Sequence, residues 1–305
     1  MRICDAHTHF FSRTFFDLLG KQASAVQGRS ADVLVAEAAE KARIELPDPS
    51  PVIHTARWLR ELDRHSVERA VAFASLPGEA AAVAEACHGS GGRLIPFILV
   101  DPTAPSGLEA GRNAVQSLGF RGVLLFPAMH RFDPQSPALD PLFGACAEHR
   151  ALVVVHCGIL QIKLRDLLGI RPAYDLHHAN PISVIAAAER HRGVNFVLPH
   201  FGCGFFREAL LAGAQSPNIF VDTSSSNSWM AAQSEDLTLE RVFRKSLQVF
   251  GPRRILFGTD SSTFPRGWRA DLFRDQKSAL DTIGLSEVDQ ARILGGNLLE
   301  LLSIP

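Results

Sequence analysis

The first ten residues, MRICDAHTHF (1–10), contain a short apolar run that ends in two histidines, His7 and His9. Three later apolar runs also end in a histidine or an aspartate: VVVHCG (153–158), FVLPHFG (196–202) and ILFGTDSS (255–262). Side chains two residues apart on a strand point to the same side, so His7 and His9 can bind one ion together. Imidazole and carboxylate groups at the ends of several strands predict a metal site.

Strand-like segments alternate with helical segments along the whole chain. This alternation predicts parallel strands joined by right-handed crossovers. We predict an α/β fold, a (β/α)8 TIM barrel, because closure would make the first and eighth strands neighbours and gather the four motifs at one mouth. In an open sheet those two strands would lie far apart. The predicted strands are 3–7, 69–74, 94–99, 122–126, 152–156, 195–199, 219–222 and 255–258.

Two long segments interrupt the predicted barrel without marking a second domain, so 1–305 is expected to be one domain. An insertion of about 40 residues (12–54) is longer than the usual connection between a strand and a helix. It contains a predicted helix at 31–42, and we expect it to fold over the mouth as a lid. The other long segment, 158–180, follows strand five. Residues 285–302 predict an extra C-terminal helix.

Composition and charge limit the classes of function that the chain can have. Hydrophobic residues make up 46% and charged residues 21% of the chain, which is typical of a soluble globular protein. The formal net charge of -1 indicates neither nucleic-acid nor membrane-surface binding. No signal-peptide pattern or bilayer-spanning run is seen, and five scattered cysteines without CxxC spacing suggest free thiols in a reducing compartment. We expect a cytoplasmic enzyme whose partners are a small-molecule substrate and, as a homodimer, another copy of the chain.

Together, DAHTHF, HCG, PHFG and GTDSS resemble the amidohydrolase superfamily, specifically amidohydrolase family 2, the aminocarboxymuconate semialdehyde decarboxylase-like group. Such proteins hold one divalent metal, usually zinc, and their strand-six histidine acts as an acid or base on the metal-bound water. Mn²⁺ and Fe²⁺ are alternative metals. The resemblance implies that the metal ligands are His7, His9, His156 and Asp260, and that the catalytic residues are His200 and Asp260.

Many superfamily members bind a second metal through a carbamylated lysine at the end of strand four. This chain has Leu124 and Leu125 there, in GFRGVLLFPAM (119–129). Without the bridging lysine, a mononuclear site is favoured.

Two further aspartates have open roles. Asp5 lies two residues before His7 and is expected to face the barrel interior with it, either orienting a ligand or making a structural hydrogen bond. Asp222 also ends a strand, but the sequence TSSSNSW that follows it favours a polar loop over a place in the site.

Substrate recognition is indicated by loop residues near the mouth. Cations there can bind a carboxylate, although surface ion pairs are the alternative for each arginine. Aromatic residues beside the motifs can form a wall for a ring, although core packing is the alternative for them. The candidate substrate-binding residues are Arg165, Arg171, Arg266, His178 and Phe10.

Three classes of function fit these features. The first is a metal-dependent hydrolase in which the metal-bound water, deprotonated with help from His200, attacks a lactone, amide or ester carbonyl of a small anionic substrate. The second is a non-oxidative decarboxylase (a lyase) of an aromatic or unsaturated carboxylic acid that uses the same metal site. The third is a catalytically silent metal-binding or scaffold protein.

Overall fold

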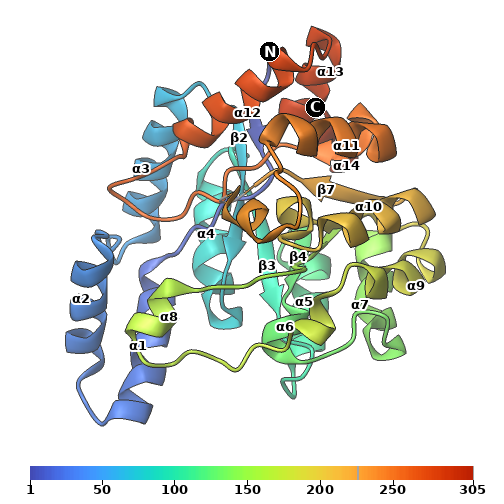
Figure 1. Cartoon of the computed structure of the whole chain (residues 1–305). Helices are drawn as coiled ribbons and strands as arrows, with labels where there is room; N and C mark the ends of the chain where they lie inside the picture. Colours follow the sequence, from blue (N-terminus) through green and yellow to red (C-terminus); the bar gives the residue numbers. More distant parts are fainter. Residues whose placement is uncertain (225–226, 305) are drawn as a thin grey trace.

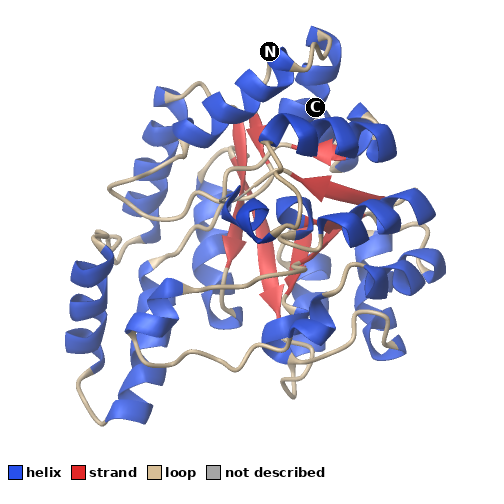
Figure 2. Cartoon of the chain, in the orientation of Figure 1, coloured by secondary structure: helices blue, strands red, loops and turns tan. Residues whose placement is uncertain are grey.

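The computed structural model describes residues 1–224 and 227–304. Eight parallel strands pair in the order β1 to β8, with helices around them (Figures 1 and 2), which confirms the predicted TIM barrel. Each predicted strand is present, although β1, β6 and β8 are each two or three residues shorter than expected. The strands are β1 (Cys4–Asp5), β2 (Arg69–Ala74), β3 (Leu94–Val100), β4 (Gly122–Leu125), β5 (Leu152–Val155), β6 (Phe196–Leu198), β7 (Ile219–Asp222) and β8 (Ile255–Leu256).

The segments that follow β1 and β8 close the barrel. The N–H of Asp260 donates to the carbonyl of His7 (2.9 Å), and the N–H of His9 donates to the carbonyl of Ser261 (2.8 Å). A Cβ at Gly258 would lie only 3.0 Å from the Cβ of His7, so glycine permits this close approach. The first and fourth motifs are therefore adjacent, as closure predicts.

The helices follow the strands in the expected alternation. Shorter 3₁₀ and π segments occur at several strand and helix ends. The α-helices are α1 (Arg13–Gln27), α2 (Ala31–Ala42), α3 (Pro51–Arg64), α4 (Ala80–Gly89), α5 (Gly107–Ser117), α6 (Pro127–His130), α7 (Asp140–Glu148), α8 (Lys163–Leu167), α9 (Ile182–Arg190), α10 (Phe206–Gln215), α11 (Leu239–Phe250), α12 (Ala270–Thr282), α13 (Glu287–Ala291) and α14 (Asn297–Leu301). The others are η1 (Pro77–Glu79), η2 (Pro137–Leu139), η3 (Leu176–Ala179), η4 (Pro199–Gly202), η5 (Asn227–Ala232), η6 (Pro252–Arg254) and η7 (Arg292–Gly296).

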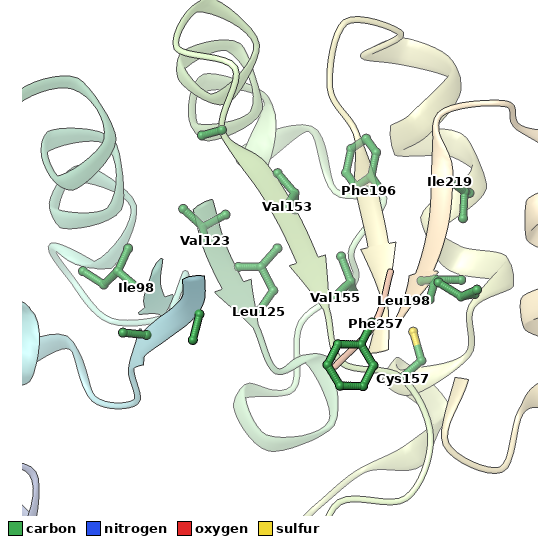
Figure 3. Packing of buried hydrophobic residues seen from close by; sticks show 14 of the residues in the cluster. Ile98, Val123, Leu125, Val153, Val155, Cys157, Phe196, Leu198, Ile219 and Phe257 are labelled. Carbon is green, nitrogen blue, oxygen red and sulfur yellow. The ribbon is translucent and has the colours of Figure 1, made fainter. Parts of the chain in front are cut away.

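Alternate strand residues separate into two buried clusters. One set packs between strands and helices; Figure 3 shows Val123 and Leu125 of β4 in it, beside Val153 and Val155 of β5. The other set is enclosed by the strands, and α14 contributes Leu298 and Leu299 to it. The predicted C-terminal helix is thus present as α13, η7 and α14, which pack against the barrel. The other enclosed residues are Cys4, Ala6, Val71, Phe73, Ile95, Phe97, Leu99, Leu124, Phe126, Leu152, Val154, Val197, Phe220, Leu256 and Leu302.

The insertion forms a small core of its own beside the barrel. The predicted helix at 31–42 is confirmed as α2, which packs on α1 and α8 (Figure 1) through residues such as Phe16, Leu34 and Leu168. The side-chain amide of Gln27 also donates to the carbonyl of Leu168 (2.7 Å). The insertion and the segment after strand five therefore form one unit. That this unit covers the mouth remains a prediction.

Two features bear on the environment of the protein. All five cysteines are buried and free. Within the described residues, no helix has the length and apolar character required to cross a membrane.

Candidate metal centre

A bend at Ala6 decides which way the first motif faces. Cys4 and Ala6 pack in the enclosed cluster, so Asp5 between them points the other way, and its carboxylate accepts from the indole N–H of Trp268 (2.8 Å). The prediction that Asp5 faces the interior with His7 is therefore wrong, because β1 ends at Asp5 and the bend interrupts the alternation. His7 turns inward, with its ring 4.8 Å from that of Phe73.

Asp5 has a structural role instead. Its carboxylate accepts from the backbone N–H of His7 (2.9 Å) and from that of Thr259 (3.1 Å). Burial raises the pKa of Asp5 to about 6, although these hydrogen bonds favour its ionised form. Asp5 thus fixes the backbone of the first motif against the segment after β8, and none of its described hydrogen bonds is to a histidine ring.

Three of the four predicted metal ligands converge on one another. The Nε2 atom of His9 lies 3.3 Å from Oδ1 of Asp260, and Nε2 of His7 lies 3.9 Å from the same oxygen. Ligand atoms of the three residues all lie within 4.8 Å of one another. His7 is 2% exposed at its side chain, whereas Asp260 is 34% exposed. The group therefore faces solvent mainly through Asp260.

Each of these two histidines is held through its other ring nitrogen. Nδ1 of His7 is 2.8 Å from Oδ2 of Asp222, and Nδ1 of His9 is 2.7 Å from Oγ of Ser75. When Nδ1 donates in this way, Nε2 keeps its lone pair. Metal-binding histidines in proteins are oriented by just such a partner on the second nitrogen.

Asp222 belongs to the site, contrary to the polar loop that its surroundings favoured. Besides His7, it accepts from the backbone N–H of His200 (3.0 Å) and of Ser224 (2.9 Å). Burial alone would raise its pKa, but the charge and hydrogen bond of His7 outweigh burial and lower the pKa of Asp222 to about 2. An aspartate that ends a fully apolar strand, IFVD (219–222), was the available signal.

His200 is brought into the site by a left-handed turn after β6. Its φ and ψ are 58° and 32°, and Phe201 has a φ of 53°. Nδ1 of His200 lies 3.0 Å from the carbonyl oxygen of Ser224, which can only accept, and 2.8 Å from Oγ of Ser224, which donates its own proton to Asp222. Both contacts favour a proton on Nδ1. Burial, followed by the charge of His7, lowers the pKa of His200. The neutral ring therefore has an unprotonated Nε2 available as a base.

His156 lies next to this group without joining it. Its ring centre is 5.2 Å from that of His200, but it is absent from the groups of closely spaced ligand atoms among the described residues. Its Nδ1 is buried and has no hydrogen-bond partner within the described chain. Burial, with the charges of His200 and His7, holds the pKa of His156 well below its usual range. A neutral imidazole keeps a lone pair on one ring nitrogen, so His156 is a suitable ligand for a cation.

The charges at the site fit a divalent cation. Partial burial works against ionisation of Asp260, but the hydrogen bond and charge of His9 outweigh it and hold the pKa of Asp260 well below its usual range. In the described chain, the ion pairs of Asp222 and Asp260 are formed with histidines, not with lysine or arginine. Buried negative charge is costly unless a cation or metal compensates it. Imidazole and carboxylate donors suit zinc or manganese.

The same hydrogen bonds favour one ion. A second group of closely spaced ligand atoms contains His7, His200 and Asp222. There, Nδ1 of His7 and the oxygens of Asp222 already bond to one another and to the backbone, so that group is a hydrogen-bond network. Leu124, where a bridging lysine would be expected, is fully buried in the enclosed cluster.

Two of the predicted substrate-binding arginines lie in different surroundings. Arg266 is exposed and its guanidinium donates to Oγ of Ser262 (3.0 Å), two residues beyond Asp260. Arg165, on α8, donates to the amide oxygen of Gln22 in the insertion (3.3 Å). Both therefore follow strands that lead into predicted ligands, and their described hydrogen bonds are to uncharged groups.

The other predicted substrate residues have alternative partners. Arg171 is exposed and lies 3.7 Å from Asp166, the surface ion pair considered from the sequence. His178 lies 3.8 Å from Asp175. Phe10 is 1% exposed and packs in the cluster between strands and helices, which is the core-packing alternative.

The chain matches the model of a known protein family over almost its whole length. The family model described as Amidohydrolase (Amidohydro_2) matches residues 4–304. No curated protein matches the chain.

Several solved structures share the fold at low sequence identity. A 5-carboxyvanillate decarboxylase from Novosphingobium aromaticivorans, complexed with manganese and 4-hydroxy-3-methoxy-5-nitrobenzoic acid, is 15% identical, with a TM-score of 0.65 and coverage of 99% of this chain and 96% of that chain. A probable 2-pyrone-4,6-dicarboxylic acid hydrolase from Acinetobacter baumannii with citric acid bound is 14% identical, with a TM-score of 0.60 and coverage of 99% and 100%. An amidohydrolase from Burkholderia multivorans with bound zinc is 16% identical, with a TM-score of 0.60 and full coverage of both chains.

Proposed function

The chain belongs to the amidohydrolase family, and from that premise we propose that it is a metal-dependent hydrolase of a lactone, amide or ester carbonyl in a small anionic substrate. The observation that carries this proposal is the state of His200. Its Nδ1 donates to a backbone carbonyl and its pKa is lowered by burial, so its Nε2 is an unprotonated base. Hydrolysis needs such a base to take a proton from water.

His7, His9 and Asp260 would hold one divalent ion, with His156 as the fourth ligand. When bound, the ion supplies Lewis acidity toward the carbonyl and lowers the pKa of a coordinated water. Zinc is our first choice, and manganese or iron fits the same donors. Mononuclear binding is supported by Leu124 and by the hydrogen bonds that occupy Asp222.

The histidine at the end of strand six moves the proton. Nε2 of His200 takes a proton from water as the water oxygen adds to the carbonyl carbon of the substrate. The proton then passes from His200 to the leaving oxygen or nitrogen as the carbon–oxygen or carbon–nitrogen bond breaks. Water is thereby divided between the two products, and His200 returns to its neutral form.

Asp222 positions the groups that take part in this proton transfer. It fixes the backbone N–H of His200 and the Nδ1 of His7, so the base and one ligand share a single anchor. The transfer distance is therefore set by the fold before substrate binds, which is how positioned groups lower a barrier.

An anionic substrate is supported by the cations around the mouth. We propose Arg266, beyond Asp260, and Arg165, on α8, as its carboxylate-binding residues, since guanidinium groups pair with carboxylates through two parallel hydrogen bonds. Two of the structures similar to this chain hold carboxylic acids, citric acid and a nitrobenzoic acid. The surroundings of Arg171, His178 and Phe10 give less support for contact with substrate.

The proposal also covers the location and partners of the protein. Five free, buried cysteines fit a reducing cytoplasm. The partner is the small-molecule substrate itself.

Decarboxylation of an aromatic or unsaturated acid is the competing reaction on this site. A decarboxylase must protonate the carbon that loses carbon dioxide, and the lowered pKa of His200 disfavours a protonated donor at rest. The test is a screen of metal-loaded protein against lactones, amides and aromatic acids in ¹⁸O-labelled water, with carbon dioxide measured in parallel. We expect one labelled oxygen in the product and no carbon dioxide. Carbon dioxide release with no label in the remaining product would overturn the hydrolase proposal.

A further inference from the structure

Another buried carboxylate, that of Glu79, lies close to His9 but outside the group that would bind metal. Glu79 ends η1 and is fully buried. Its two oxygens accept from the backbone N–H of Ser12 (2.6 Å) and of Ser75 (2.7 Å). In the part of the chain that the structure describes, no lysine or arginine forms an ion pair with it. Burial raises the pKa of Glu79 to about 7, and a carboxyl group in such a place costs stability.

Both partners of Glu79 are connected to His9, one through a hydrogen bond and the other along the chain. Ser75 follows β2, and its Oγ lies 2.7 Å from Nδ1 of His9. Ser12 comes three residues after His9, just beyond the first motif, and caps α1 by accepting from the N–H of Phe15. Glu79 therefore fixes the residue that holds the His9 ring and also the chain that leaves His9. It joins the loops after strands one and two at one point.

We infer that Glu79 is a positioning residue that keeps Nε2 of His9 directed at Asp260, acting through Ser75. Glu79 touches neither substrate nor metal. It holds the Ser75 backbone, and Ser75 Oγ lies 2.7 Å from Nδ1 of His9, so the ring is held with its Nε2 3.3 Å from Oδ1 of Asp260. With a metal ion on Nε2, the proton of the neutral ring would lie on Nδ1 and face Ser75 Oγ. This inference rests on the proposed metal site. Partners of this kind typically contribute about 10–100-fold to metal affinity.

The test measures the zinc and manganese affinity of the full chain by competition with a chromophoric chelator. Glu79→Gln keeps the size of the side chain but replaces one acceptor by a donor, so the N–H of Ser12 or of Ser75 loses its partner. Ser75→Ala removes only the hydroxyl that meets His9. We expect each variant to bind metal about 10–100-fold more weakly. The double variant should be weaker by less than the product of the two effects, because both act on one path.

A second measurement separates positioning from general loosening of the fold. Nitrogen-15 NMR of the zinc-loaded protein reports which ring nitrogen of His9 carries the proton. We expect Nδ1–H in the wild type, with Nε2 on the ion, and a mixture of tautomers in Glu79→Gln. Should that variant not fold, Glu79→Asp, which is too short to reach both serines, takes its place with the same expected result.

The matched control is Asn218→Asp. The Asn218 amide donates to the carbonyls of Ala188 and Val194 at the opposite end of the barrel, before β7. This change should lower thermal stability and leave metal affinity and the His9 tautomer unchanged. Metal affinity in Glu79→Gln or Glu79→Asp equal to that of the wild type would overturn the inference about Glu79. A wild type that binds no metal would instead overturn the proposed function.

Discussion

Strands on one side of the barrel mouth lead into titratable side chains, whereas strands on the other side end in apolar ones. β1, β7 and β8 lead into His7, Asp222 and Asp260, and these three form ion pairs at 2.8 and 3.9 Å. β3 and β4 end in Val100 and Leu125, which are 1% and 0% exposed. The same position in the fold thus carries charge on one side and apolar packing on the other.

The backbone conformation also differs between the two sides: it is left-handed at residues on the polar side and extended at the strand ends of the apolar side. His200 and Asp260 have φ values of 58° and 57°, in the left-handed region that side chains other than glycine seldom adopt. β3 and β4 continue as regular strands to their last residues, with Val100 paired to Leu125. Strained conformations persist where the surroundings hold them, typically at functional sites. The proposed metal binding and catalysis therefore fall on the polar side, and we expect the apolar side mainly to stabilise the barrel.

Removal of a ligand on the polar side should have the largest effect. His9→Ala deletes one of three converging groups, so metal affinity should fall by more than the roughly 100-fold expected for an indirect partner. The variant should fold normally, because the His9 side chain is at the solvent edge with 14% exposure. Circular dichroism and chelator competition check both points. Undiminished metal affinity would show that the polar side of the mouth does not bind the metal through His9.

His200→Ala should separate binding from chemistry. We expect retained metal and a kcat lower by about 10²–10⁴, the usual contribution of a general base. Elemental analysis and turnover of the best substrate from the screen measure the two effects. Loss of metal with loss of activity would make His200 a ligand instead of the proton carrier.

The pH profile of the wild type also tests whether His200 is the general base. The active form of His200 is neutral, so kcat/KM should rise with pH as His200 loses its proton. Because burial lowers the pKa of His200, the midpoint of this rise should lie below pH 6.5, the ordinary value for histidine. A midpoint above pH 7 would contradict this assignment.

Asp222→Asn should weaken metal binding by about 10–100-fold, because an amide nitrogen would oppose the Nδ1–H of His7. The oxygen that serves the N–H groups of His200 and Ser224 can remain, so the loop should keep its shape. Chelator competition gives the affinity. An unchanged affinity would mean that Asp222 serves the fold alone.

On the apolar side, Leu125→Ala should act on stability and leave metal affinity unchanged. Truncating a fully buried leucine costs about 2–5 kcal/mol in the free energy of unfolding. Denaturant unfolding of the metal-free protein measures the cost. Metal affinity that fell along with stability would show that the two sides are coupled.

The smallest effects should come from the loops. Arg171→Gln breaks an exposed pair with Asp166 and should leave KM within about twofold, since such pairs contribute little. Arg266→Gln should raise KM for an anionic substrate by about tenfold, equivalent to one charge-assisted hydrogen bond. Initial rates compare the two variants directly, and the reverse order would reassign the anion site.

The sequence was sufficient for the eight strands and for the convergence of His7, His9 and Asp260. Each strand is a short apolar run, several of these runs lead into a histidine or an aspartate, and closure of the barrel brings those polar ends together. The orientation of Asp5 was beyond reach because it depends on a bend at Ala6.

The network behind the histidines was equally beyond reach of local patterns. Asp222 bonds to His7 across 215 positions of the chain, and Ser75 bonds to His9 across 66. Glu79 lies in a 3₁₀ turn with no motif around it. Periodicity finds strands and their ends, whereas these partners are chosen by three-dimensional proximity.

The central claim is that one divalent ion is held by His7, His9 and Asp260, with His156 beside them. Elemental analysis of the purified wild type and of Asp260→Asn, after equilibration with zinc and removal of the excess, tests it most directly. We predict one ion per wild-type chain and a large loss in the variant. No bound metal in the wild type, two ions per chain, or equal metal in both proteins would contradict it.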